Sequence, residues 1–135
     1  MIRLQPVERD ANDRVVPVED LPAVYGATAA DNGPTFTYTP DEVSRDDDVV
    51  EVVIVGLIDD DWCYVSMLDA QDWSDLWDTE DETDATALVE IVLAGLPTFV
   101  PRAAIVPRTV GLAALVSAPT FSQVPSTFTW RRQPR

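Results

Sequence analysis

The chain has 135 residues, 46% of them hydrophobic, which is typical of one folded domain, and we expect a single domain over residues 1–135. Its 24 acidic residues outnumber nine basic residues, all of them arginine, so that the net charge is −15. Without histidine or lysine the chain lacks an imidazole base, a Schiff-base amine and a phosphate-loop lysine, which leaves open only catalysis by carboxylates or by magnesium or calcium bound to them.

The first quarter of the chain, residues 1–34, is rich in proline, aspartate and alanine and has little periodicity. We expect it to be an irregular N-terminal segment in front of a sheet and helix core formed by residues 35–135. Within the segment, Val15–Val18 is interpreted as a short edge strand, because its proline cannot donate a hydrogen bond to a neighbouring strand. Residues 19–25 favour a short helix that a second proline weakens.

Three strands are predicted next. Thr35–Thr39 alternates threonine with aromatic residues, which is a strand pattern. Val49–Ile58 is dense in β-branched residues and predicts a central strand covered on both faces. Trp62–Leu68 then returns as a second strand, so that the turn between them, Asp59–Asp61, carries three carboxylates at the tip of a hairpin.

The following acidic segment is harder to interpret. Ala70–Trp77 has the apolar spacing of an amphipathic helix, with aspartates beside its two tryptophans and its leucine. Residues 78–84 predict an exposed, solvated loop. A calcium-binding loop does not fit there, because Thr83 stands where such a loop needs glycine.

The last third of the chain contains a strand, a helix and a final strand. Ala87–Ala94 alternates as a strand does, and Thr98–Val100 could extend it beyond a turn. Pro107–Ala118 predicts the main helix, since proline suits the first helical position and the apolar residues form one stripe. Phe128–Trp130 alternates as a short last strand. The fold class predicted is therefore α+β, an antiparallel β-sheet with one main C-terminal helix packed on it.

The negative charge is concentrated in one stretch. Between Asp46 and Pro101 the sequence holds sixteen acidic residues and no basic residue, and the rest of the chain is close to neutral. A salt-adapted or codon-biased proteome would account for the missing lysine, but it would spread the acids evenly. Both explanations of the acidic stretch, bias and function, stay open.

Tryptophans accompany these acids. Tryptophan is enriched at the energetic centres of protein interfaces, although core packing is its ordinary role. Cys63, in the middle of a predicted strand, is expected to be a buried and inert thiol. The residues predicted to contact a partner are Asp59, Asp60, Asp61, Trp62, Asp72, Trp73, Asp75, Trp77, Asp78, Glu80, Asp81 and Glu82.

The C-terminal third resembles the tail of a known family, the bacterial immunity proteins of polymorphic toxin systems, which include inhibitors of deaminase toxins. The segments that carry the resemblance are Thr98–Pro101, Ile105–Pro107, the alanine- and leucine-rich helix Val110–Val116, and a short strand that ends in Trp130. The chain departs from the family pattern at Pro119–Pro125, which is longer than the usual turn and lacks glycine.

The resemblance implies a non-catalytic antidote that occludes a partner toxin, and the charge fits a basic partner independently. We expect no enzyme, no cofactor, no metal, no nucleic acid and no membrane partner, since phosphates would be repelled and no apolar run approaches the roughly 20 residues that cross a bilayer. We expect a cytoplasmic location, because the N-terminal residues show no export-signal pattern. The alternatives are a small phage or assembly protein that makes subunit contacts through its acidic face, and a carboxylate-based enzyme. The oligomeric state stays open.

Overall fold

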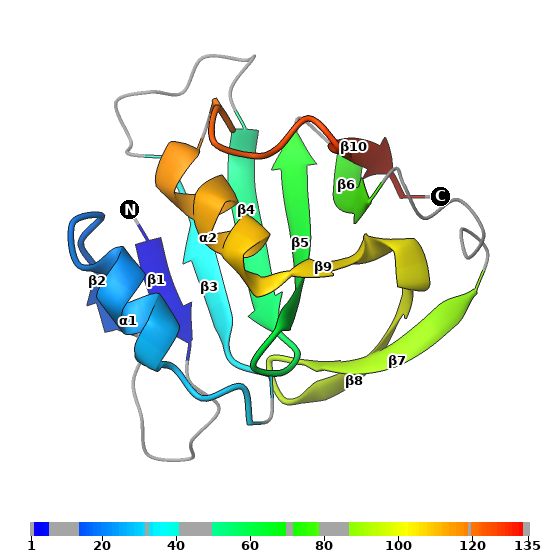
Figure 1. The fold of residues 1–135 in the computed structure, drawn as a ribbon, viewed down its shortest axis with the longest axis horizontal. Coiled ribbons are helices and arrows are strands. Elements are labelled where there is room, and N and C mark those ends of the chain that lie inside the picture. The colour runs from blue at the N-terminus through cyan, green and yellow to red at the C-terminus, as the bar shows by residue number, and fades with distance from the viewer. Residues whose placement is uncertain are drawn as a thin grey trace.

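The computed structural model describes residues 2–5, 14–31, 33–40, 50–69, 72–78, 87–118 and 120–133. Within them, eight strands form one antiparallel sheet, two more form a separate hairpin, and two helices accompany them (Figure 1). The predicted α+β class, with a C-terminal helix packed on an antiparallel sheet, is confirmed. The elements in chain order are β1 (Ile2–Gln5), β2 (Arg14–Val16), α1 (Leu21–Ala27), β3 (Thr35–Tyr38), β4 (Val50–Leu57), β5 (Trp62–Asp69), β6 (Asp72–Asp78), β7 (Leu88–Leu93), β8 (Leu96–Pro101), the 3₁₀ turn η3 (Arg102–Ala104), β9 (Ile105–Pro107), α2 (Arg108–Ser117) and β10 (Phe128–Arg132).

The order of strands across the sheet is β10-β6-β5-β4-β3-β1-β2, and β9 pairs with the first part of β5. The β-branched strand β4 therefore lies in the middle, as its sequence predicts. Strands β4 and β5 form the predicted hairpin, with Leu57 opposite Cys63 and Val55 opposite Val65. The acidic turn Asp59–Asp61 is exposed at its tip, which confirms that prediction.

The expectation of an irregular N-terminal segment was wrong for the described part of residues 1–34. Strand β1 lies inside the sheet, between β3 and β2, and its Ile2 and Leu4 are buried in the main core. The alternation with Arg3 and Gln5 is a strand pattern, but four residues are too few to distinguish it from chance. The short edge strand and the short helix expected within the segment are confirmed as β2 and α1.

The helical interpretation of residues 70–77 was also wrong, because Asp72–Asp78 is strand β6. The spacing of Trp73, Leu76 and Trp77 fits a helix face, yet β6 is paired on both sides. Ser66 of β5 lies opposite its Asp75, and Trp130 of β10 lies opposite its Leu76. Hydrogen bonding to two neighbouring strands outweighs the local helical spacing. The sequence of the segment alone does not show that these partner strands are present.

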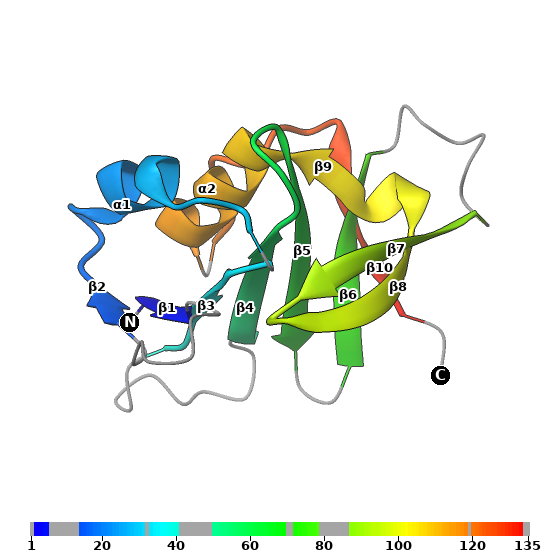
Figure 2. The same cartoon turned by 90° about the horizontal axis from the view of Figure 1, so that it is seen from below.

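Both helices lie on one side of the sheet, as Figure 2 shows. Because successive side chains of a strand point to opposite sides, Cys63 and Val65 of β5 face the main core under the helices, and Tyr64 belongs to a second cluster. Helix α2 contributes the buried Ala114 and Leu115 to the main core.

The second cluster lies between the sheet and the β7–β8 hairpin. It joins Tyr64 with Ile91 of β7 and Val100 of β8. The sequence left Thr98–Val100 as an extension of the preceding strand, but β8 instead folds back antiparallel to β7. The reason is the two-residue turn Ala94-Gly95, in which both residues have positive φ angles (50° and 80°), the geometry of tight hairpin turns.

Helix α2 approaches the sheet closely at Gly111. A β-carbon at this position would lie 2.6 Å from the Tyr25 hydroxyl oxygen, 2.7 Å from a Val55 methyl and 2.8 Å from Cys63 Sγ. Glycine weakens a helix by about 1 kcal/mol relative to alanine, which is why the sequence alone presents Gly111 as a weakness of α2. The structure shows instead that no larger residue fits between the helix and the sheet.

We predict that Gly111→Ala lowers the free energy of unfolding by about 1 kcal/mol or more, since overpacking costs about 1–3 kcal/mol and exceeds the helix-propensity gain. The matched control is Gly26→Ala in α1, where a β-carbon would meet nothing within 4 Å. The control should be neutral or stabilising by up to about 1 kcal/mol. Urea denaturation of both variants is the measurement. Equal stabilisation by the two substitutions would contradict the close approach of α2.

Candidate functional site

The predicted partner-binding residues do not form one surface. Asp59, Asp60, Asp61 and Trp62 lie together at the β4–β5 turn, whereas Asp72 lies at the opposite end of β5. At about 3.3 Å per residue, the eight residues of β5 separate the two groups by about 23 Å. Asp72 there forms an ion pair with Arg132 at 3.5 Å. The acidic turn and the start of β6 are therefore separate places on the molecule.

Asp75 is not available to a partner, which corrects its place among the predicted contacts. It is only 4% exposed, and its carboxylate accepts hydrogen bonds from the Tyr64 hydroxyl and, at 2.8 Å, from Gln133 Nε2. Burial, and then the neighbouring carboxylate, raise the pKa of Tyr64, so that it stays protonated and donates. The strand period places Asp75 on the side of β6 that faces Tyr64 and the second cluster, opposite to the buried Leu76, and there it binds Gln133, the residue after β10, to the sheet.

The three tryptophans differ in exposure. Trp62 is 44% exposed at the tip of the hairpin. Trp73 is half-buried, and Trp77 packs into the second cluster with the Arg131 guanidinium 5.1 Å from its ring centre. Trp62 is thus the one that adjoins exposed acids in the described part of the chain. Asp78 ends β6, and the predicted contacts Glu80, Asp81 and Glu82 lie outside the described residues.

The acidic turn has a defined conformation. One carboxylate oxygen of Asp59 accepts hydrogen bonds from the backbone amides of Asp61 and Trp62, both at 2.8 Å. The amide of Ile58 also donates to the Trp62 carbonyl at 3.1 Å. Asp59 therefore shapes the turn, as aspartate commonly does, and leaves Asp60 and Asp61 as its outward carboxylates.

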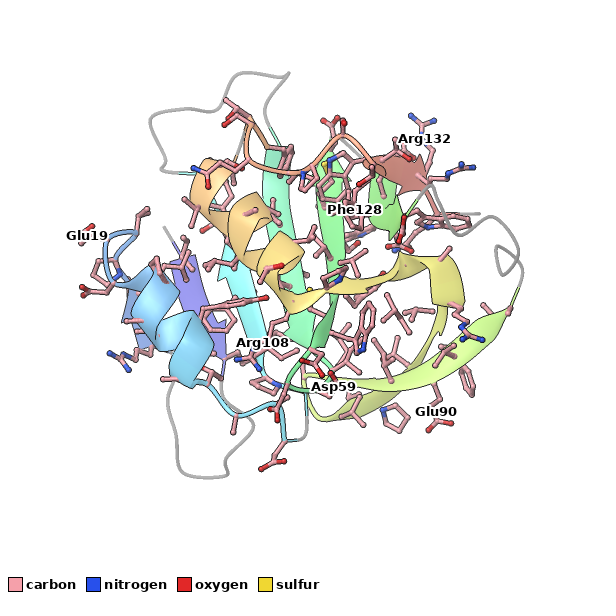
Figure 3. All side chains as sticks on the ribbon, viewed as in Figure 1. Glu19, Asp59, Glu90, Arg108, Phe128 and Arg132 are labelled. Carbon is pink, nitrogen blue, oxygen red and sulfur yellow. The ribbon has the colours of Figure 1, made fainter. Side chains whose placement is uncertain are left out.

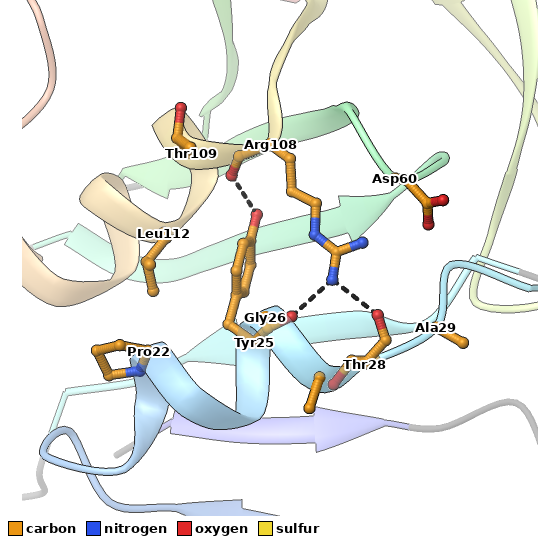
Figure 4. Close-up of a pocket in the computed structure, with 10 residues that line it drawn as sticks. Pro22, Tyr25, Gly26, Thr28, Ala29, Asp60, Arg108, Thr109 and Leu112 are labelled. Atoms are coloured by element: carbon orange, nitrogen blue, oxygen red, sulfur yellow. Dashed lines mark hydrogen bonds between the residues drawn. The ribbon is translucent and has the colours of Figure 1, made fainter.

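Arg108, the first residue of α2, connects this turn to both helices (Figures 3 and 4). Its Nη2 donates to the carbonyl oxygens of Tyr25 and Thr28 at 2.6 and 2.7 Å, and its Nη1 donates to the carbonyl of Asp59 at 3.4 Å. Its own amide donates to the Asp61 carbonyl at 2.9 Å, and its carbonyl accepts from the Tyr25 hydroxyl at 2.6 Å. Together these hydrogen bonds fix the position of the turn.

A shallow cleft of about 500 Å³ lies beside the turn (Figure 4). One side of α1, the residues directly after it and the first part of α2 form its walls, which are apolar at Pro22 and Leu112. Asp60 and Arg108 supply its charged groups. The cleft is large enough for a side chain or two of a partner, and Asp60 is the residue of the acidic turn that lines it.

Cys63 lies under this region but takes no part in its chemistry. It is fully buried, as the sequence predicts, and its thiol donates to the Pro107 carbonyl at 3.5 Å. Burial raises its pKa to about 12, so that it is a thiol rather than a reactive thiolate at neutral pH.

Sequence reasoning missed the role of Arg108. One signal was present: a positive charge at the start of a helix opposes the helix dipole. An arginine directly after Pro107, in the first turn of the predicted helix, therefore indicates that its charge is used elsewhere. What the sequence could not supply is the acceptor set, since Tyr25 and Thr28 are 83 and 80 residues away in the chain.

Among the described residues, no three acidic or cysteine side chains gather as metal ligands would. No described helix has the length and hydropathy needed to cross a membrane. No known protein-family model matches the sequence, and no curated protein matches it. The function has to be inferred from the residues themselves.

We predict that Arg108→Gln lowers the free energy of unfolding by about 2 kcal/mol or more, since hydrogen bonds from charged groups contribute about 1.5–3 kcal/mol. Amide hydrogen exchange at Asp61 and Trp62 should also accelerate. The control is Arg14→Gln on the edge strand β2, an exposed arginine whose loss changes the net charge equally. That variant should stay within about 0.5 kcal/mol of the parent. Unchanged exchange in the turn of Arg108→Gln would contradict the role given to Arg108.

Proposed function

We propose that this protein is a non-catalytic inhibitor, of the immunity-protein kind, that binds and neutralises a basic protein partner through the turn Asp59–Trp62 and the cleft beside it. The observation that carries the proposal is the combination of exposed carboxylates and a half-exposed tryptophan on a turn that Arg108 holds in place. A contact surface ordered before binding loses less conformational entropy when the partner arrives.

The charge distribution supports a basic partner. The turn lies in the stretch from Asp46 to Pro101, which holds sixteen acidic residues and no basic one. Such a surface attracts a cationic cleft over distance and repels nucleic acid. A toxin that acts on nucleic acid carries a cleft of this kind, and an acidic turn can occupy it in place of phosphates. The resemblance of the C-terminal third to immunity proteins points the same way.

Co-expression with the product of the gene immediately upstream is the first test. Co-purification with a toxin whose activity is lost in the complex would support the proposal. Binding to a neighbouring capsid or tail protein would support the assembly alternative instead, and hydrolytic activity of the isolated chain would support the carboxylate enzyme.

We predict that association with the partner is strongly salt-dependent. Charges are screened beyond about 8 Å at physiological ionic strength, so that raising salt from low to physiological levels removes most of the long-range attraction. The association rate should fall several-fold more than the dissociation rate rises. Surface plasmon resonance or stopped-flow measurement at several salt concentrations tests this. An association rate that does not change with salt would show that the acidic stretch does not contribute to association.

Neutralising the turn should weaken binding without harming the fold. In the triple variant Asp59→Asn, Asp60→Asn and Asp61→Asn, the side-chain amide oxygen introduced at position 59 can still accept the two turn hydrogen bonds, and like-charge repulsion falls. We expect equal or slightly higher stability and binding weakened by about 2–4 kcal/mol, because charge-assisted hydrogen bonds contribute about 1.5–3 kcal/mol each. Isothermal calorimetry measures the binding, and thermal unfolding measures the stability.

The matched control removes three exposed acids elsewhere, with Glu19→Gln, Asp20→Asn and Asp31→Asn. In Figure 3, Glu19 lies at the left edge of the molecule, near β2 and α1, and away from Asp59. The control makes the same change in net charge. A difference in binding between the two triple variants therefore reports where the charges were removed and not how many. Equal binding by the two triple variants would show that the turn is not the contact.

A further inference from the structure

The outer face of the β7–β8 hairpin exposes apolar side chains that the core does not use. On this face Leu88 is 65% exposed, Val92 is 41% and Phe99 is 66%, and Leu96, beside the turn of the hairpin, is 68% exposed. Single exposed apolar residues are normal on a protein surface, but a group of them on one element indicates an interaction site. The described residues include seven large hydrophobic side chains that are exposed, and four of them lie on this one hairpin.

The strand register explains why these side chains share a face. Pairs of residues opposite each other in a hairpin lie on the same side, so that Val89 with Val100 and Ile91 with Thr98 face the second cluster. The alternate pairs face outward. These outward pairs are Leu88 with Pro101, Glu90 with Phe99, and Val92 with Pro97. Leu96 pairs with Leu93 of the second cluster, so that it is exposed beside the turn and not on the outer face.

The edges of the hairpin are less suited to binding than its face. Along β8, Pro97 and Pro101 have no N–H, and proline fits a strand only where that group would point away from the neighbouring strand. The outer edge of β8 therefore lacks two donors. The edge of β7 is approached by Gly33, whose carbonyl accepts from the Ala94 amide at 2.9 Å and whose β-carbon, if present, would overlap the Val92 carbonyl. A partner strand cannot readily extend the hairpin along either edge.

The face carries one charge, that of Glu90, in the middle of the apolar residues. Figure 3 shows Glu90 pointing away from the body of the protein. It makes no ion pair with another described residue, and no basic residue occurs in the sequence between Asp46 and Pro101. A partner that covers the apolar residues must also compensate Glu90, because an unpaired buried carboxylate is costly.

We propose that the outer face of the β7–β8 hairpin is a second docking surface, for an apolar patch of a protein partner that places an arginine or lysine opposite Glu90. A second copy of this chain does not fit. In a symmetric pair the same patch would face itself and bring two Glu90 carboxylates together between chains of charge −15. The inference shares with the proposed function only the positive charge of the partner, and it does not need the acidic turn.

The probe for the test is a synthetic peptide of about ten residues that alternates lysine with valine and phenylalanine, long enough to span a strand of this hairpin. It is titrated into the full chain carrying labelled leucine and valine methyl groups. Saturable shifts are expected for the methyl groups of Leu88 and Val92. Phe99→Ser should weaken peptide binding about tenfold, which corresponds to about 1.4 kcal/mol. Val18→Ser, which removes a side chain of similar exposure (51%) outside the hairpin, should leave binding unchanged.

A second peptide with glutamate in place of lysine tests the charge. It should bind about tenfold more weakly, and Glu90→Gln should reduce that difference several-fold. Because Phe99 and Glu90 are exposed, both variants should unfold at the temperature of the parent, so that loss of binding is not loss of fold.

Three outcomes would overturn the proposal. The first is the absence of saturable shifts on the hairpin, and the second is equal binding of the lysine and glutamate peptides. The third is a set of shifts that depends on protein concentration without any peptide, which would make a second copy the occupant. Hairpin shifts should persist when the turn Asp59–Asp61 is neutralised. If that variant loses partner binding but keeps the hairpin shifts, the acidic turn and the hairpin face act as separate surfaces.

Discussion

The guanidinium of Arg108 is the interaction on which the arrangement of this protein depends. A guanidinium can only donate hydrogen bonds, and three backbone carbonyls from α1, the segment after it and the β4–β5 turn accept them. The Tyr25 carbonyl in the last turn of α1 also accepts from the Thr28 amide at 3.4 Å, so that the arginine adds a second, shorter hydrogen bond at this helix end. One side chain thereby fixes a helix and a hairpin tip that are remote in sequence.

The same contact explains why the main helix packs so closely. Arg108 begins α2, and its carbonyl accepts the Tyr25 hydroxyl, so that the ring of Tyr25 is held against the first turn of the helix. Gly111 lies one turn further on, where a β-carbon would collide with that hydroxyl and with Cys63. Burial raises the pKa of both groups, so that they remain neutral inside the core. Arg108 therefore holds the first turn of α2 against Tyr25, and the missing side chain of Gly111 lets the helix approach the sheet.

The sequence predicted what depends on neighbours in the chain and missed what depends on distant ones. Strands β3, β4 and β5 carry their pattern within a few residues, and so does the acidic turn between the last two. Strand β6 was missed because its two partner strands override a helical spacing. Asp75 was misplaced because β6 is covered on both sides at this point, where Asp75 and the adjacent Leu76 are both buried, and nothing local shows that cover. Arg108 looked like one more surface arginine, since nothing local shows where its acceptors lie.

The two proposed surfaces would affect different rates of binding. Exposed carboxylates on the turn act at a distance, so that they raise the association rate and are screened by salt. An apolar face acts only on contact, and differences in contact area and fit appear mainly in the dissociation rate. The two surfaces are connected, because Leu93 at the end of β7 packs where Gly56 of β4 leaves room, close to the acidic turn in the chain. A partner that contacted both surfaces would gain a fast association rate from the turn and a slow dissociation rate from the hairpin face, whereas a partner with positive charge alone would associate quickly and dissociate quickly.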